Sequence, residues 1–235
     1  MTTDTALPPV IELRQYTLHP GRRDELITLF EREFIESQEA CGMQLLGQFQ
    51  DLDEADRFVW LRGFADMPAR AQALADFYGG PVWQAHRNAA NATMIDSDNV
   101  LLLRPCVQLP LTSGAIASTA ESNPRSNPGS GQVLATICPL REPAGDALRR
   151  CVAEHVLPQL QAQGAQLLAC LETEPATNTF PRLPVREGES VLVWLLSLPE
   201  GVATPQIDTG ALLDRWLRDL PQTLRLQAAP RSAWR

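Results

Sequence analysis

Hydrophobic and polar positions alternate with a period of two over residues 10–18, which predicts a half-buried β-strand ending before Pro20-Gly21. The period then changes to that of a helix, which we expect to run to about Ala40 and to stop at Gly42. The apolar stripe of this helix consists of Leu26, Leu29, Phe30 and Phe34.

Further strands are predicted near 43–50 and 57–64, separated by the polar turn DLDEAD. The next helical region is broken at Gly79-Gly80-Pro81, and Pro81 suits the first turn of a new helix over 81–93. A last strand, VLLLR, is expected at 100–104. The order strand, helix, strand, strand, helix, strand is that of a ferredoxin-like unit, which places the chain in the α+β class.

The pattern recurs in the second half of the chain. GMQLLG starting at Gly42 matches GAQLLA starting at Gly164, an offset of 122, and FVWL at 58–61 matches LVWL at 192–195. FVWL and LVWL are farther apart than the first pair of matching segments, because the second half contains an added Pro-rich segment, TEPATNTFPRLPVREGE. A shared element order supports a duplication.

A stretch rich in Ser, Gly, Pro and Asn separates the two halves and is predicted to be a flexible linker. We therefore expect one ferredoxin-like domain over 1–106, the linker over 107–131 and a second, diverged ferredoxin-like domain over 132–235. Helices on one face of each sheet leave the other face to be covered, so two such tandem units, each with an antiparallel sheet, are expected to stack.

Composition narrows the partners and the location of the protein. The formal net charge of −8 without a basic cluster argues against nucleic acid and membrane surfaces. The start of the chain resembles no secretory signal, and no apolar run is long enough to span a bilayer, so a soluble, cytoplasmic protein is expected. The five cysteines are widely spaced and suggest buried thiols rather than a metal site.

Two segments carry a family resemblance. IELRQYTLHPG at 11–21 resembles the opening of NIPSNAP domains, and FYGGPVWQAHRNAANATMIDSDNVLLLRP at 77–105 resembles the end of bacterial ones. The resemblance covers about residues 10–105, whereas the second half has no counterpart to the HRNAAN segment. It implies a dimeric α/β-barrel fold in which two sheets enclose a small cavity, and it implies little about the reaction.

The first strand offers candidate ligand-binding residues. Alternation separates Ile11 and Leu13 from Glu12, Arg14 and Tyr16. If the apolar pair faces the helices, the polar three point into the barrel. Gln48 and either Trp60 or Arg62 then join them from neighbouring strands, and such a set could orient a small polar ligand. The alternative is that Glu12 and Arg14 pair with neighbours at a wet sheet edge. At the offset of 122, Glu12, Arg14 and Tyr16 become Leu134, Thr136 and Cys138, so the second half loses this set.

The helix over 81–93 offers a candidate catalytic residue. A helical wheel places Val82, Ala85, Ala89 and Ala92 on the face expected to contact the sheet, with His86 at its edge. Histidine can act as a general base near neutral pH, although a hydrogen-bonded histidine at the core boundary explains the same position. Further round the helix lie two more candidate ligand-binding residues, Arg87 and Asn91.

These observations leave several functions open. The first is binding of a small molecule in a barrel cavity, with cofactor-independent monooxygenase-like or isomerase-like catalysis as an extension. The alternative is a non-catalytic interaction or scaffold protein, favoured if an apolar patch is exposed on the helices or if side chains fill the cavity completely. Haem binding through His86 is a third possibility. No cofactor and no metal site are predicted from the sequence, and a homo-oligomer is possible.

Overall fold

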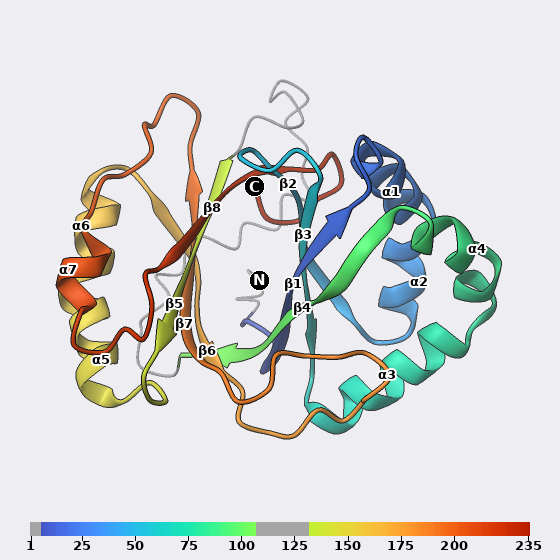
Figure 1. The fold of residues 1–235 in the computed structure, drawn as a ribbon, viewed down its shortest axis with the longest axis horizontal. Helices are drawn as coiled ribbons and strands as arrows, with labels where there is room; N and C mark the ends of the chain where they lie inside the picture. The colour runs from blue at the N-terminus through green and yellow to red at the C-terminus, as the bar shows by residue number, and fades with distance from the viewer. Residues whose placement is uncertain (1–5, 107–131) are drawn as a thin grey trace, which may run out of the picture.

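The computed structural model describes residues 6–106 and 132–235, and within these ranges eight strands close into a single barrel. The strand order around the barrel is β1-β3-β2-β8-β5-β7-β6-β4, so one chain supplies both sheets. The helices of the first half cover one outer side of the barrel and those of the second half cover the opposite side (Figure 1). The predicted linker at 107–131 lies outside the described residues.

The first half follows the predicted element order. The helical region is broken at Gly80, as predicted, and the long first helix contains a π-helical turn, η1, in its middle. The last strand starts at Met94, earlier than the predicted residue 100. The elements are β1 (Val10–Leu18), α1 (Arg23–Leu29), η1 (Phe30–Phe34), α2 (Ile35–Ala40), β2 (Gln44–Asp51), β3 (Arg57–Phe64), α3 (Met67–Gly79), α4 (Pro81–Asn91) and β4 (Met94–Pro105).

The second half repeats this order with one reduction. Its first strand, π-helical turn and second strand end at Leu140, Val156 and Thr173, each 122 residues after the equivalent end in the first half. A single short helix, α7, stands where the first half has α3 and α4. The elements are β5 (Gln132–Leu140), α5 (Asp146–Cys151), η2 (Val152–Val156), α6 (Leu157–Ala162), β6 (Gln166–Thr173), β7 (Ser190–Leu198), α7 (Thr209–Leu213) and β8 (Gln222–Ala228).

All strand pairs of the barrel are antiparallel. In each half the first strand is central: β1 lies between β3 and β4, and β5 lies between β7 and β8. Two short seams join the halves, one between β2 and β8 and one between β4 and β6. In the second seam Leu103 lies opposite Thr173 and Arg104 lies opposite Glu172.

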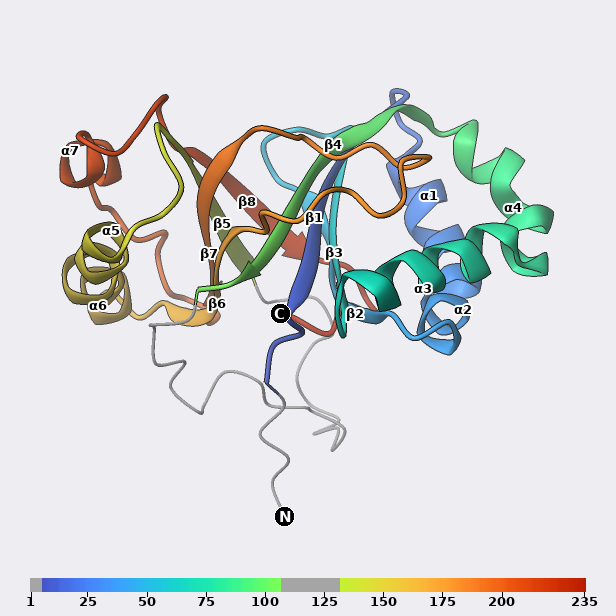
Figure 2. The same ribbon diagram turned by 90° about the horizontal axis from the view of Figure 1, so that it is seen from below.

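Three apolar clusters fill the space between these elements. One contains strand residues of both halves, such as Leu13 and Val193, and therefore occupies the barrel interior. The other two lie between each sheet and its own helices, with Trp60 in the first half and Trp194 in the second. Because helices cover the outer face and the opposite sheet covers the inner face, the central strands are buried on both faces (Figure 2).

The predicted orientation of the first strand is wrong. Ile11 and Leu13 belong to the interior cluster, whereas Tyr16 belongs to the cluster under the helices of the first half. Glu12 and Arg14 share the parity of Tyr16 and point to the same, helical side. Alternation separates the two faces of a strand without saying which face meets the helices, and in this barrel the interior is filled by apolar side chains of both halves.

The predicted buried face of α4 is also wrong. Ala85, Ala89 and Ala92 are exposed, whereas Ala90 is fully buried. The helix contacts η1 and α3, so the large ring of Trp83 rather than a row of alanines determines which face is covered. Within the described ranges no helix has both the length and the apolar character needed to cross a membrane.

Candidate ligand-binding site

Glu12 lies at the centre of a buried cluster of three arginines under the helices of the first half. Its Oε2 accepts hydrogen bonds from Arg14 Nη1 at 2.7 Å and Arg62 Nε at 2.8 Å. Its Oε1 accepts a hydrogen bond from Arg70 Nε at 2.7 Å. All four side chains are at most 1% exposed. We call these four residues the arginine cluster.

Strand register and helix capping assemble the arginine cluster. Glu12 and Arg62 lie directly opposite each other on β1 and β3, so their side chains leave the sheet on the same face. Arg70 comes from the first turns of α3. Asp66 caps this helix by accepting a hydrogen bond from the backbone N–H of Ala69 at 2.6 Å.

The arginine cluster carries an excess of positive charge. Among the described residues, Glu12 is the only carboxylate within ion-pair distance of its three arginines. Burial alone would raise the pKa of Glu12, but the charges of Arg62, Arg14 and Arg70 outweigh burial and hold that pKa far below its usual value. Burial lowers the pKa of Arg70, and repulsion from Arg62 and Arg14 adds to this shift although Glu12 opposes it.

Hydrogen bonds connect the arginine cluster to neighbouring polar side chains. Arg14 Nε donates to Tyr16 Oη at 3.0 Å, and Arg62 Nη1 donates to Gln38 Oε1 at 2.9 Å. Burial raises the pKa of Tyr16, even though the charge of Arg14 lowers it, so the phenol keeps its proton. Tyr16 and Gln38 thus present polar atoms that are each bonded to a guanidinium group.

These two polar groups line a narrow aromatic pocket between the sheet and the helices. Its volume is about 30 Å³, which is room for roughly two water molecules. Trp60 also lines the pocket, and its indole Nε1 is buried without a hydrogen-bond partner among the described residues. Half-buried Tyr78 and Trp83 complete the wall. The remaining lining residues are Leu26, Phe30, Phe34, Phe77, Ala90 and Met94.

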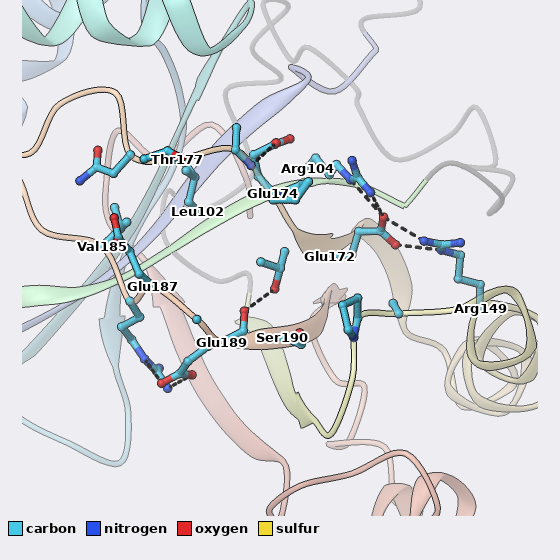
Figure 3. Close-up of a pocket in the computed structure, with 18 residues that line it drawn as sticks. Leu102, Arg104, Arg149, Glu172, Glu174, Thr177, Val185, Glu187, Glu189 and Ser190 are labelled. Carbon is cyan, nitrogen blue, oxygen red and sulfur yellow. Dashed lines mark hydrogen bonds and ion pairs between the residues drawn. The ribbon is translucent and has the colours of Figure 1, made fainter.

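A larger cavity of about 420 Å³ lies at the seam between β4 and β6 (Figure 3). On one wall Glu172 accepts hydrogen bonds from Arg104 and Arg149, and on another Arg186 pairs with Glu189. Five charged side chains of the seam cavity are therefore already paired with one another. In the described ranges no group of three or more His, Cys, Asp or Glu side chains is arranged to hold a metal ion.

The second half provides an internal comparison for the arginine cluster. Leu134 and Leu196 form the strand pair that matches Glu12 and Arg62, and they lie in an apolar cluster. Thr136 stands at the position of Arg14 and Cys138 at that of Tyr16. Apolar side chains therefore occupy the equivalent position in the second half without buried charge, so the fold itself does not require the arginine cluster.

The structure gathers part of the predicted site. Glu12, Arg14 and Tyr16 lie together, as expected from their shared parity. Gln48 is buried on the same sheet face and lies opposite Trp60, which in turn lies opposite Arg14.

The candidates on α4 lie apart from the arginine cluster. His86 is half-buried, and its Nε2 lies 3.4 Å from Glu33 Oε2. Arg87 and Asn91 are exposed and line neither the aromatic pocket nor the seam cavity.

Sequence reasoning did not identify Arg70 and Gln38. Arg70 lies on the same helical stripe as Ala73, Leu74 and Phe77, which are all buried. A charged residue on an apolar stripe is the signal that could have identified it. Gln38 offers no comparable signal, because it belongs to the last turns of a helix whose register is shifted by the π-helical turn.

Comparisons with known proteins agree with this architecture. Over nearly the whole chain the fold resembles an anthrone oxidase-like protein, with 13% identity, a TM-score of 0.58, and coverage of 94% of this chain and 91% of that one. It also resembles a candidate monooxygenase from Lactobacillus acidophilus, with 12% identity, a TM-score of 0.53, and coverage of 96% and 97%. At these identities the likeness concerns the fold alone, a mixed α+β fold with an antiparallel barrel.

The first half has relatives of its own. An uncharacterised NIPSNAP-like domain protein from Burkholderia xenovorans is 29% identical over 43% of this chain and 88% of that chain, with a TM-score of 0.40. A search of curated proteins finds no match. The NIPSNAP family model matches residues 11–110, the part of the chain that carries the arginine cluster and the aromatic pocket. Residues 11–110 of the chain therefore match the NIPSNAP family.

Proposed function

We propose that the NIPSNAP domain of this chain binds a small organic anion with a flat apolar body. The anionic group would face the arginine cluster and the apolar body would enter the aromatic pocket. This site replaces the barrel interior predicted from the sequence, because the interior is filled by apolar side chains of both halves.

The observation that carries the proposal is the buried charge excess. Three guanidinium groups surround one carboxylate, and every member is removed from solvent. An uncompensated buried charge costs several kcal/mol, and the weak screening at a buried site strengthens its attraction for an anion. A ligand carboxylate or phenolate beside Tyr16 and Gln38 would reduce this excess.

The aromatic pocket determines the rest of the ligand. Rings of Phe30, Phe34, Phe77 and Trp83 line it, which suits a planar apolar group. Trp60 Nε1 needs an acceptor, and an oxygen of the ligand would supply one. In the present conformation the pocket holds only a few atoms, so we expect the half-buried rings of Tyr78 and Trp83 to move when a ligand enters.

We further propose that 1–106 and 132–235 are diverged copies of one ferredoxin-like unit, with only the first retaining the site. Equal spacing of the first two strands and of the π-helical turn in each half supports the duplication. Replacement of Glu12 and Arg62 by Leu134 and Leu196 supports the division of roles.

The proposal is tested by titrating the protein with benzoate and with benzamide, a neutral molecule of the same shape. Fluorescence of Trp60 and Trp83, which line the pocket, reports binding, and calorimetry confirms it. We expect benzoate to bind at least about tenfold more tightly than benzamide, a difference of about 1.4 kcal/mol. Equal affinity for the two molecules, or no binding of either, contradicts the proposal.

Two variants localise the effect. Arg62→Leu, which copies Leu196 of the second half, should weaken benzoate binding by about tenfold or more, because hydrogen bonds to charged groups contribute about 1.5–3 kcal/mol. Arg104→Leu removes the same charge from the seam cavity, where the side chain is 40% exposed, and should leave benzoate binding unchanged.

The same site suggests a chemistry beyond binding. Nearby positive charge favours the ionised form of a phenol or enol and lowers the pKa of such a ligand. We include cofactor-independent, monooxygenase-like or isomerase-like conversion of such ligands in the proposal. Oxygen uptake with phenolic substrates tests the monooxygenase-like reaction. A non-catalytic interaction or scaffold protein is the alternative, and the filling of the barrel interior by apolar side chains favours it. An apolar patch on the helices does not support it, because Leu212 is the only large hydrophobic helix residue that is exposed among the described residues.

A further inference from the structure

The segment 174–189 connects β6 to β7 and has no counterpart of similar length in the first half, where residues 52–56 connect β2 to β3. It corresponds to the Pro-rich segment that lengthens the second repeat. It leaves the sheet of the second half and runs across to α3 of the first half (Figure 1). We call this segment the strap.

The strap contacts the arginine cluster directly. Arg70 Nη1 donates to Asn178 Oδ1 at 3.0 Å and to Thr179 Oγ1 at 3.3 Å. Asn178 is itself held in place, because its Nδ2 donates to the Leu183 carbonyl at 2.9 Å and its Oδ1 accepts from the backbone N–H of Phe180. Arg70 is thus fixed between Glu12 on one side and residues of the other half of the chain on the other.

The strap also reaches the wall of the aromatic pocket. The ring of Phe180 stacks on Tyr78, with a centroid distance of 6.2 Å and an interplanar angle of 25°. Phe180, Leu183 and Val185 pack against the apolar cluster under the helices of the first half. Two contacts of different chemistry, one to Arg70 and one to Tyr78, therefore join the strap to the proposed site.

Both ends of the strap are anchored, while much of it borders empty space. The backbone N–H groups of Glu174 and Arg186 donate to carbonyls of β4 at 2.9 and 2.8 Å. Residues 174–178 and 185–189 of the strap line the seam cavity of about 420 Å³. Asn178 lines this cavity and also binds Arg70, so a change at Asn178 alters the hold on Arg70 without removing a packed core residue.

We propose that Asn178 and Thr179 are positioning residues of the site in the NIPSNAP domain, so that anion recognition in the first half depends on the second half. The inference rests on the proposed function, because it gives the strap a role at that site. Two neutral acceptors hold Arg70 without cancelling its charge. The guanidinium group therefore stays oriented toward Glu12 and contributes its charge to the ligand site.

The test compares the double variant Asn178→Ala/Thr179→Ala with Glu187→Gln, which changes an exposed residue of the same strap. The first measurement uses the protein without ligand and follows rotation of the Arg70 guanidinium group by ¹⁵N NMR, its signal assigned from its loss in Arg70→Lys. Slow rotation is expected in the wild type and in Glu187→Gln, and fast rotation in the double variant. Unchanged rotation in the double variant overturns the proposal.

The second measurement repeats the benzoate and benzamide titrations. The double variant should lose about tenfold in benzoate affinity, as expected for loss of charge-assisted hydrogen bonds that orient Arg70, and should bind benzamide as the wild type does. A parallel loss for both molecules indicates a merely structural role and overturns the proposal. If the double variant does not fold, Thr179→Val removes one acceptor of Arg70, together with the hydroxyl that donates to the Met67 carbonyl, at nearly constant shape. It should shift both measurements in the same direction by a smaller amount.

The two proposals fail in different ways. If the wild type binds neither molecule, the proposed function fails, whereas the rotation of Arg70 still decides whether the strap positions it. If benzoate binds selectively and the double variant keeps that selectivity, the proposed function stands and the role of the strap is refuted.

Discussion

Removal of the single carboxylate from the arginine cluster should be far more damaging than removal of one arginine. Glu12→Leu copies Leu134 of the second half and leaves three buried guanidinium groups without a counter-charge. At an effective dielectric constant of about 20, one pair of charges about 4 Å apart interacts by about 4 kcal/mol, and Glu12 makes three such contacts. Desolvation offsets much of this sum, and breaking a buried pair typically costs about 3–5 kcal/mol. We expect Glu12→Leu to reach the upper end of that range.

Arg62→Leu acts in the opposite direction on the charge balance. It leaves Glu12 with two arginines and lowers the excess charge. The free energy of unfolding therefore falls only because acceptors such as Gln38 Oε1 lose their donor, which costs about 1–3 kcal/mol. The double variant Glu12→Leu/Arg62→Leu reproduces the Leu134–Leu196 pair and should be more stable than Glu12→Leu alone. If Arg62→Leu stabilises the Glu12→Leu variant although it destabilises the wild type, the site carries excess positive charge in the Glu12→Leu variant.

The assay is equilibrium unfolding in urea followed by tryptophan fluorescence, with the melting temperature as a second readout. For a chain of this size each kcal/mol corresponds to about 2–4 °C, so a loss of about 5 kcal/mol should make Glu12→Leu melt about 10–20 °C below the wild type. If Arg62→Leu destabilises as much as Glu12→Leu, or if the double variant is the least stable of the three, the charge-excess argument is refuted.

The dependence of stability on pH gives an independent check. The folded-state pKa of Glu12 is depressed by its three arginines, so its contribution is fully present above the unfolded value of about 4.3 and is lost as the pH falls below it. Wild-type stability should therefore decline on acidification below about pH 5 more steeply than that of Glu12→Leu. Parallel pH profiles for the two proteins would show that Glu12 is not ionised in the folded state.

Other predictions concern parts of the molecule outside the site. Burial raises the pKa of the Cys138 thiol to about 12, so at pH 8 this thiol should resist alkylation until the protein unfolds. Half-buried Cys151 should react in the native state, and mass spectrometry of labelled peptides distinguishes the two cysteines. Gly63→Ala would place a Cβ atom 2.0 Å from the ring of Pro8 and should destabilise by about 1–3 kcal/mol. Gly145→Ala meets no atom within 4 Å and should change the unfolding midpoint little, and equal effects of the two substitutions in thermal melts would contradict the packing described here.

Much of the fold could be predicted from local sequence patterns. Alternation over 10–18, the Gly79-Gly80-Pro81 break and the sequence repeat at an offset of 122 each predicted an element that the structure contains. These signals are local, because they depend on backbone preferences and on the periodicity of burial within a few turns. Where side chains are small, as in α4, burial is decided by a larger neighbour, and the alanine pattern gave the wrong face.

The candidate site was only half predictable. Parity alone groups Glu12, Arg14 and Tyr16, since alternate residues of a strand share a face whatever the strand packs against. Arg70 and Gln38 come from helices and meet this group through packing between distant segments.

Sequence patterns alone were enough to predict the element order of the first half and the polar set on the first strand. Tertiary structure alone decided which side of the sheet that set occupies, because this depends on the sheet and the helices that cover each face. It also brought the strap of the second half onto Arg70, a contact between residues 108 positions apart. Periodicity groups the positions that share a face, whereas only the folded chain shows what covers that face.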